Sequence, residues 1–174
     1  MSDSSVLLNL LATDSLASIA VANGWQWAIC PVVREESRKL RDPVSDEMVL
    51  TDLTPLVSTG VLQVLDLSGE AEQLCYVEQS MLVDDGEAMS IAIAAQRGFE
   101  LAMDDKQAAN HARRSFPRLR LWSTPEIIQQ WAAAAKVEPK RLRNALQLIE
   151  SRARYFPPKA HPLAEWWRRA KESP

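Results

Sequence analysis

The amino-acid sequence predicts an α/β protein with a mainly parallel sheet covered by helices on both faces. Short stretches rich in β-branched and aromatic residues alternate with longer stretches in which apolar residues recur at helical spacing. The segments between successive strands are long enough to hold a helix, as parallel strands require. After residue 122 only helical patterns follow. We therefore predict an α/β domain over residues 1–122 and a helical C-terminal extension over residues 123–174, packed on the same domain.

The first half of the chain is predicted to open with a helix. Apolar residues recur at helical spacing from Val6 to Val21, with a break expected near Thr13-Asp14, and Asn23-Gly24 favours a left-handed stop. The next elements are expected to be a strand over 25–30, a helix from Pro31 to about Leu40, a polar connection, a helical turn from 54 to 60 and a strand over 61–67.

The second half is predicted to contain a helix that is apolar or small on nearly every side, over 86–97, which indicates a buried helix ended by Gly98. A helix over 70–81 precedes it. It is followed by a strand over 99–103, a helix over 106–114, a strand over 118–122 and tail helices over 126–135, 139–154 and 162–171.

Composition limits the class of protein. With 174 residues, 47% of them hydrophobic, the chain can bury one substantial core. Its two cysteines, Cys30 and Cys75, have no zinc or redox spacing and are expected to be core thiols in a reducing compartment. No apolar run reaches the length needed to cross a bilayer and no signal peptide pattern opens the chain. We expect a cytoplasmic protein with no membrane partner.

The net charge of −3 conceals two halves of opposite sign. Residues 1–105 carry 5 Lys+Arg against 18 Asp+Glu, whereas residues 106–174 carry 15 against 5. This division suits a protein that gathers carboxylates at one site and offers cations to a polyanion beside it. Surface ion pairs between the halves would produce the same division.

Acidic residues fall near the ends of predicted elements, where parallel sheets place their polar sites. They are Asp3, Glu36, Glu87, Asp104 and Asp105. Carboxylates gathered in one pocket repel one another, and a divalent cation with oxygen ligands would stabilise them. Mg²⁺ or Mn²⁺ fits best because no His or Cys cluster accompanies the acids. Such a metal lowers the pKa of a water that attacks a phosphodiester.

Each acid taken alone also fits a structural role. Glu36 fits a solvated helix residue, Asp104 or Asp105 fits a helix cap, and Asp3 fits a frayed terminus. Only the set as a whole, with its placement at the ends of strands, favours a metal site.

Four segments resemble, in order, the motifs of the PIN-domain family. Asp3-Ser4-Ser5-Val6 is similar to the family's opening motif, and Pro31-Val32-Val33-Arg34-Glu35-Glu36 to its second, in which Glu36 is the acid. Asp85-Gly86-Glu87-Ala88 resembles the Gly-Glu-Ala helix start of one branch, and Leu101-Ala102-Met103-Asp104-Asp105 the closing strand and acidic pair. The resemblance covers residues 3–122, and the helical tail is similar to the ending of that branch.

The resemblance implies a three-layer α/β/α fold and metal-dependent cleavage of single-stranded RNA, as in the VapC-type toxins of toxin–antitoxin pairs. It implies Asp3, Glu36, Glu87, Asp104 and Asp105 as catalytic metal ligands, and an antitoxin protein and a homodimer as partners. Only Met1 and Ser2 precede Asp3, so the first strand is expected to be truncated. Met103 stands where many relatives carry a threonine.

Ser5, Arg113 and Arg114 are the predicted substrate-binding residues, since a hydroxyl beside the acids and nearby guanidinium groups can hold phosphates. The alternative is a catalytically inactive PIN-like module that binds protein or RNA, because a truncated first strand would hold the first ligand poorly. Metal binding discriminates between the two. A phosphoacceptor receiver domain ranks below both, because Leu121-Trp122-Ser123 stands where its lysine would be.

Overall fold

The computed structural model describes residues 1–172. The structure is mixed α/β and 57% helix, so helical residues far outnumber strand residues. Contacts divide the chain into two compact units. Unit 1 consists of Met1–Leu7, Gln26–Arg38 and Asp52–Ser123, and unit 2 of Leu8–Trp25, Lys39–Thr51 and the chain from Thr124 onward. The chain therefore passes between the units several times, and the helical tail belongs to the same unit as two earlier segments.

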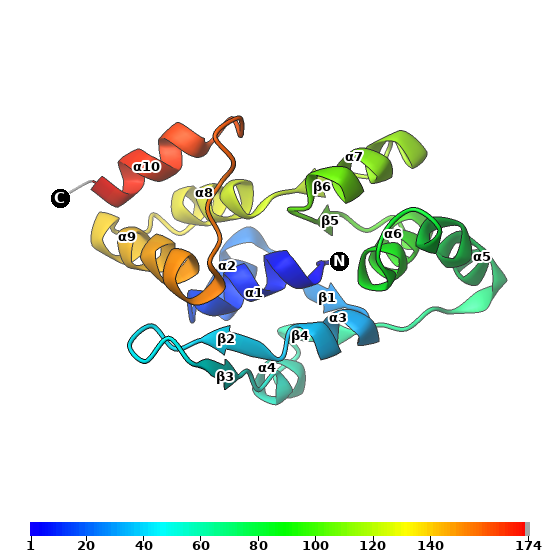
Figure 1. Cartoon of the computed structure of the whole chain (residues 1–174), viewed down its shortest axis with the longest axis horizontal. Coiled ribbons are helices and arrows are strands. Elements are labelled where there is room, and N and C mark those ends of the chain that lie inside the picture. The colour runs from blue at the N-terminus through cyan, green and yellow to red at the C-terminus, as the bar shows by residue number, and fades with distance from the viewer. Residues whose placement is uncertain (173–174) are drawn as a thin grey trace. The chain divides into compact units, whose positions relative to one another are not determined.

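Unit 1 alternates strands with helices, as the sequence patterns predict (Figure 1). Its elements are β1 (Trp27–Ile29), α3 (Pro31–Glu36), α4 (Thr54–Ser58), β4 (Leu62–Val64), α5 (Gly69–Ser80), α6 (Asp85–Arg97), β5 (Leu101–Ala102), α7 (Lys106–Ser115) and β6 (Leu121–Trp122). The first residues of α1 (Ser4–Ala12) also belong to this unit.

The strands of unit 1 form two parallel pairs, β1 with β4 and β5 with β6. The segment Met1–Asp3 joins them: the Ser2 N–H donates to the Ala28 carbonyl at 2.9 Å, and Ser2 forms a parallel bridge with Ala102. The predicted mainly parallel sheet is therefore present only as short pairs, and no continuous central sheet forms in residues 1–172. The first strand is reduced to one bridge, because Asp3 already caps a helix.

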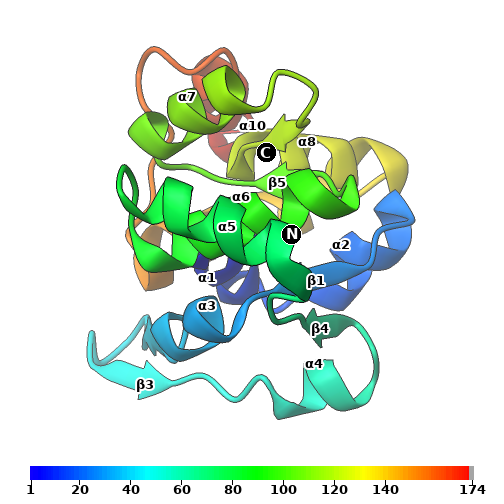
Figure 2. The same ribbon diagram turned by 90° about the vertical axis from the view of Figure 1, so that its right-hand side faces the viewer.

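Helices α5 and α6 lie against each other in both views of the ribbon (Figure 2). Arg97, at the end of α6, donates from Nε and Nη2 to the two carboxylate oxygens of Glu72 on α5, at 2.7 and 2.8 Å. The guanidinium lowers the pKa of Glu72 to about 2. This ion pair, in which Glu72 is buried and Arg97 half-buried, holds the two helices in register and so sets the position of α6, whose first turn carries Gly86 and Glu87.

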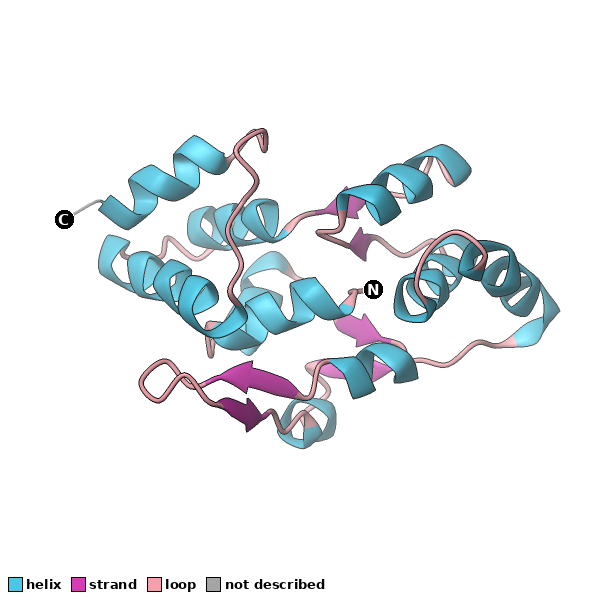
Figure 3. Cartoon of the chain, viewed as in Figure 1, coloured by secondary structure: helices cyan, strands magenta, loops and turns pink. Residues whose placement is uncertain are grey.

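Unit 2 is mostly helical (Figure 3). It holds the second half of α1, then α2 (Leu16–Asn23), β2 (Lys39–Arg41), β3 (Met48–Leu50), α8 (Thr124–Ala134), α9 (Pro139–Leu148), the π-helical turn η1 (Ile149–Ala153) and α10 (Ala164–Glu172). Its core gathers buried side chains from the start and the end of the chain, among them Leu10, Ile19, Ile127, Trp131 and Leu146.

The antiparallel hairpin β2–β3 corrects the prediction of a helix to Leu40 and a polar connection after it. Helix α3 ends at Glu36, and Lys39–Arg41 alternates exposed and buried side chains around Leu40. The Asp42 carboxylate accepts the N–H groups of Val44 and Ser45 and shapes the turn. An alternation of three residues is too short to reveal a strand against a preceding helical pattern.

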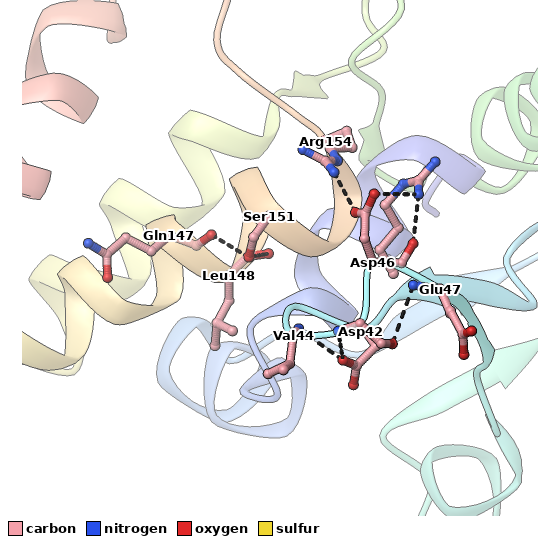
Figure 4. A network of polar contacts seen from close by, with 10 residues as sticks. Asp42, Val44, Asp46, Glu47, Gln147, Leu148, Ser151 and Arg154 are labelled. Carbon is pink, nitrogen blue, oxygen red and sulfur yellow. Dashed lines mark hydrogen bonds and ion pairs between the residues drawn. The ribbon is translucent and has the colours of Figure 1, made fainter.

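The hairpin turn is held to η1 by an ion pair between Asp46 and Arg154 (Figure 4). Both residues have positive φ angles, 60° and 56°, which side chains adopt at a cost of about 1 kcal/mol each. Arg154 ends the helical stretch that was predicted to run unbroken from 139 to 154.

Other local predictions are confirmed. The first helix breaks at Thr13-Asp14, where Asp14 has a φ of 52°, and Gly24 ends α2 with a φ of 64°. Gly98 ends α6 in the same left-handed conformation. In residues 1–172 no single helix has the length and apolar character to cross a bilayer. Helices α1 and α2 have that length and composition only when they are taken together, and the chain bends by 106° between them.

Candidate functional site

Asp3 caps α1 from a buried position. Its side chain is 3% exposed, and Oδ1 accepts the N–H of Val6 at 2.7 Å, which satisfies one free donor of the first turn. The Ser5 hydroxyl donates to the same carboxylate at 3.0 Å. Burial raises the pKa of Asp3 to about 7, and the charge of Asp104 adds to the rise. The structural alternative for Asp3, a frayed terminus, is wrong, because main-chain bonds to both neighbouring strands order this segment.

Asp104 lies beside Asp3. It follows β5, and its N–H donates to Asp3 Oδ2 at 3.3 Å. The main-chain N–H of Asp3 in turn donates to the Ala102 carbonyl at 3.0 Å. The two acids therefore stand at the carboxyl ends of adjacent parallel segments, which is where α/β proteins place polar sites.

Glu36 and Glu87 meet at the first turn of α6. Glu36 closes α3, and a Cβ atom on Gly86 would lie only 2.8 Å from its Oε2, so the carboxylate lies directly against the glycine. Burial raises the pKa of Glu87, and the charges of Asp105, Asp84 and Glu36 raise it further. A hydrogen bond from the Asp84 N–H opposes them.

Asp105 caps α7, as the structural alternative for this residue predicts. Its Oδ1 accepts the N–H of Ala108 at 2.7 Å. Asp3, Glu87 and Asp105 thus each serve the first turn of a different helix, where the free N–H groups favour negative charge. The starts of α6 and α7 bring Glu87 and Asp105 close enough for the charge of Asp105 to raise the pKa of Glu87.

The donor set suits a hard divalent cation. The acids supply only oxygen ligands, and the charges that act on Glu87 all come from other carboxylates, so a cation would relieve their repulsion. Within residues 1–172, however, no three Asp, Glu, His or Cys side chains are already arranged to hold a metal ion. The acids form two groups, Asp3 with Asp104 and Glu36 with Glu87, and side-chain movements would have to complete a coordination shell.

The predicted substrate-binding residues lie at different distances from the acids. Ser5 is exposed and bonded to Asp3. Arg113 and Arg114 lie in the last turn of α7, which places Arg113 about 12 Å along the helix axis from Asp105. The structure therefore puts Ser5 next to the acids and both arginines at the far end of α7.

Two features of the site were missed in the sequence. Asp84 precedes α6, and its charge raises the pKa of Glu87. The run of acids at Asp84, Asp85 and Glu87 is the sequence signal that could have indicated it. The Cys30 thiol caps α3 and lies 3.8 Å from both the Gly86 carbonyl and the Ser90 hydroxyl. Burial raises the pKa of this thiol. Cys30 and Cys75 are both buried and free, which confirms them as core thiols.

Comparisons with family models, with curated proteins and with solved structures found no match to this chain. The resemblance to PIN domains remains a prediction, together with the activity, cofactors and partners that it implies.

Proposed function

We propose that this protein is a metal-dependent endoribonuclease that cleaves phosphodiester bonds of single-stranded RNA. The observation that carries the proposal is the pairing of Asp3 with Asp104 at the ends of adjacent parallel segments. Glu36 and Glu87 supply a second acidic pair within the same compact unit. Asp105 adds its charge to that pair.

A PIN-like three-layer body is part of the proposal. The order of hydrogen-bonded segments supports it, because Met1–Asp3 is bonded to Ala28 of β1 on one side and to Ala102 of β5 on the other. The first acid of the family stands at the end of a central strand, and Asp3 follows this central segment. Helices α3, α5, α6 and α7 connect the strands, as parallel pairing requires.

The proposed chemistry needs no protein nucleophile. Bound Mg²⁺ or Mn²⁺ would supply an activated water and neutralise phosphate charge. Ser5 and the Val6 N–H orient the Asp3 carboxylate, and Gly86 leaves the space that the Glu36 carboxylate occupies beside α6. Asp3, Glu36, Glu87, Asp104 and Asp105 are the proposed ligand set, which Ser5 supports through its hydrogen bond to Asp3.

We also propose a cytoplasmic toxin of the VapC type, with an antitoxin protein and a second copy of the chain as partners. Exposed apolar residues on α5 and just after it support a protein partner. Leu74, Val77 and the C-cap residue Met81 recur at helical spacing and are 58%, 56% and 80% exposed.

The alternative is a PIN-like module that has lost cleavage and binds protein or RNA. Two observations favour it: the first strand is a single bridge, and no three acids in the described part of the chain are arranged for a metal. Metal affinity separates the two functions.

The test is isothermal titration of Mn²⁺ into metal-free protein. Glu36→Gln removes one proposed ligand. Glu35→Gln is its matched control, because Glu35 is the adjacent acid, is exposed as Glu36 is, and pairs with Arg38. We expect saturable binding in the wild type and in Glu35→Gln, and its loss in Glu36→Gln. With Mn²⁺ present, wild type and Glu35→Gln should cleave a fluorescent single-stranded RNA, and Glu36→Gln should not. Absence of wild-type binding would overturn the nuclease proposal and favour the binding module.

A further inference from the structure

A pocket opens at the end of β5 opposite the acids. It has a volume of about 670 Å³ and lies between the last turn of α6, the α6–β5 connection and the α7–β6 connection. Asp104 follows the other end of β5, about 13 Å along the extended chain from Glu100 at the pocket rim. Ligand sites in proteins have volumes of roughly 300–1,000 Å³. The pocket is thus large enough for a planar ring and is separate from the acidic site.

The walls of the pocket are aromatic and apolar. Phe99 and Phe116 contribute rings, and Pro117 and Leu119 contribute aliphatic surface. Phe99 is 38% exposed and Phe116 is only partly buried, so both rings retain accessible surface. Aromatic faces that remain accessible in a pocket suit another flat ring.

The chain around the pocket is cationic. Residues 113–120 contain four arginines and no Asp or Glu. Arg118 lines the pocket, and Arg114 lies in the last turn of α7, which leads to it. Neither arginine makes an ion pair within residues 1–172. In the described part of the chain, Arg113 donates only to the Asn110 amide oxygen. These guanidinium groups are available to phosphates.

Arg120, which lines the pocket, stacks on Trp122 in a cation–π contact. The Arg120 guanidinium lies 4.3 Å from the centroid of the Trp122 ring. Glu100, the acid at the rim, accepts the Trp122 Nε1–H at 2.6 Å and is 3.8 Å from Arg120. The only rim carboxylate among the lining residues is therefore bound to its neighbours, and the net charge offered to a ligand is positive.

We propose that this pocket binds a base of single-stranded RNA, with Arg118, Arg113 and Arg114 holding the adjacent phosphates. An acidic peptide would satisfy the arginines but would not need two accessible aromatic rings. Single-stranded nucleic acid combines flat rings with regular negative charge. The choice of RNA as the ligand rests on the proposed function. RNA binding is measured without metal, so that failure of the pocket proposal can be told apart from failure of the nuclease proposal.

The experiment is fluorescence anisotropy of a fluorescein-labelled decauridylate RNA, titrated with the full chain in EDTA. Arg118→Gln is compared with Arg168→Gln, a matched loss of charge at an arginine that is already paired with Glu165 and Glu172. We expect Arg118→Gln to weaken binding several-fold and to reduce the slope of log affinity against log salt by about 0.7. Arg168→Gln should bind as the wild type does.

Phe99→Leu tests the base pocket itself, because leucine fills the space without an aromatic face. We expect it to weaken decauridylate binding by about fivefold or more. Binding of an abasic decamer should be unchanged by this substitution. Thermal melting of each variant establishes that it folds.

Three results would overturn the proposal. They are equal affinities for Arg118→Gln and Arg168→Gln, an equal effect of Phe99→Leu on the abasic decamer, and a decaglutamate peptide that binds as tightly as the RNA. Loss of Mn²⁺ binding with intact RNA binding would overturn the nuclease function and leave this pocket in place.

Discussion

The carboxylate of Asp3 accepts the main-chain N–H of Asp104, although the two residues are 101 positions apart in the chain. This bond brings together the first and last acidic motifs of the sequence. It also places a second carboxylate beside a buried one, and the pKa of Asp3 rises to about 7 through burial and the charge of Asp104. Without metal, the site stores unfavourable electrostatic energy at neutral pH.

Asp3→Asn should stabilise the metal-free protein above pH 7. The folded-state pKa of Asp3 is about 7, above the unfolded value near 3.9, so between these values the folded state holds a proton that the unfolded state has lost. Stability from this group is fully present below about pH 4 and falls as pH rises to about 7. Asparagine caps helices as well as aspartate does. We expect Asp3→Asn to raise the free energy of unfolding by about 1–3 kcal/mol at pH 8 and to change it little at pH 4. Urea unfolding in EDTA measures both.

Glu70→Gln is the control for this pH dependence, because it removes an exposed carboxylate of the same compact unit. An Asp3→Asn variant that is less stable than the wild type at pH 8 would show that the Asp3 charge is stabilising and would contradict the prediction.

Gly86→Ala should separate folding from metal binding. A methyl group at this position would lie 2.8 Å from Glu36 Oε2, so the flexible Glu36 side chain must turn away. Alanine is favoured over glycine within helices by up to about 1 kcal/mol. We expect an equal or higher melting temperature, with Mn²⁺ affinity reduced several-fold in calorimetry. Unchanged affinity would remove Glu36 from the ligand set.

Arg97→Gln should loosen α5 from α6. It leaves Glu72, whose side chain is 7% exposed, without its guanidinium partner, and an orphaned buried charge costs about 3 kcal/mol. The pKa of Glu72 is lowered to about 2, so the stability that the pair contributes is present above about pH 4.5 and is lost as pH falls toward 2. Urea unfolding of wild type and variant at pH 7 and pH 2.5 measures both effects. If wild type and Arg97→Gln differ in free energy of unfolding by as much at pH 2.5 as at pH 7, this account is contradicted.

Val77→Glu should disrupt self-association if α5 provides the homodimer surface. Val77 lies between Leu74 and Met81 on an exposed apolar face, and a charge there would be desolvated in an interface. We expect the variant to elute as a monomer in light scattering at a concentration where the wild type is dimeric. Val44→Glu is the control, since Val44 is 92% exposed in a hairpin turn. A dimer that survives Val77→Glu would place the interface elsewhere.

Sequence patterns predicted most helices and the local features that end them. The stops at Gly24 and Gly98, the cap at Asp105 and the buried character of α6 all follow from short-range chemistry. The same patterns placed Asp3, Glu36 and Glu87 near the ends of elements, where the structure has them. They failed for the hairpin β2–β3, whose three-residue strands carry too few residues to show a period of two.

The sequence by itself determined which segments are helical and which residue types are available for a site, because both depend on contacts within a few residues. Only the tertiary structure decided that Met1–Asp3 lies between β1 and β5, that Glu36 lies against Gly86, and that aromatic and cationic residues surround one pocket. It also decided that residues 8–25 and 39–51 join the helical tail in one unit. These relationships join residues tens of positions apart, and they form only when burial of a shared core offsets the entropy of closing long loops.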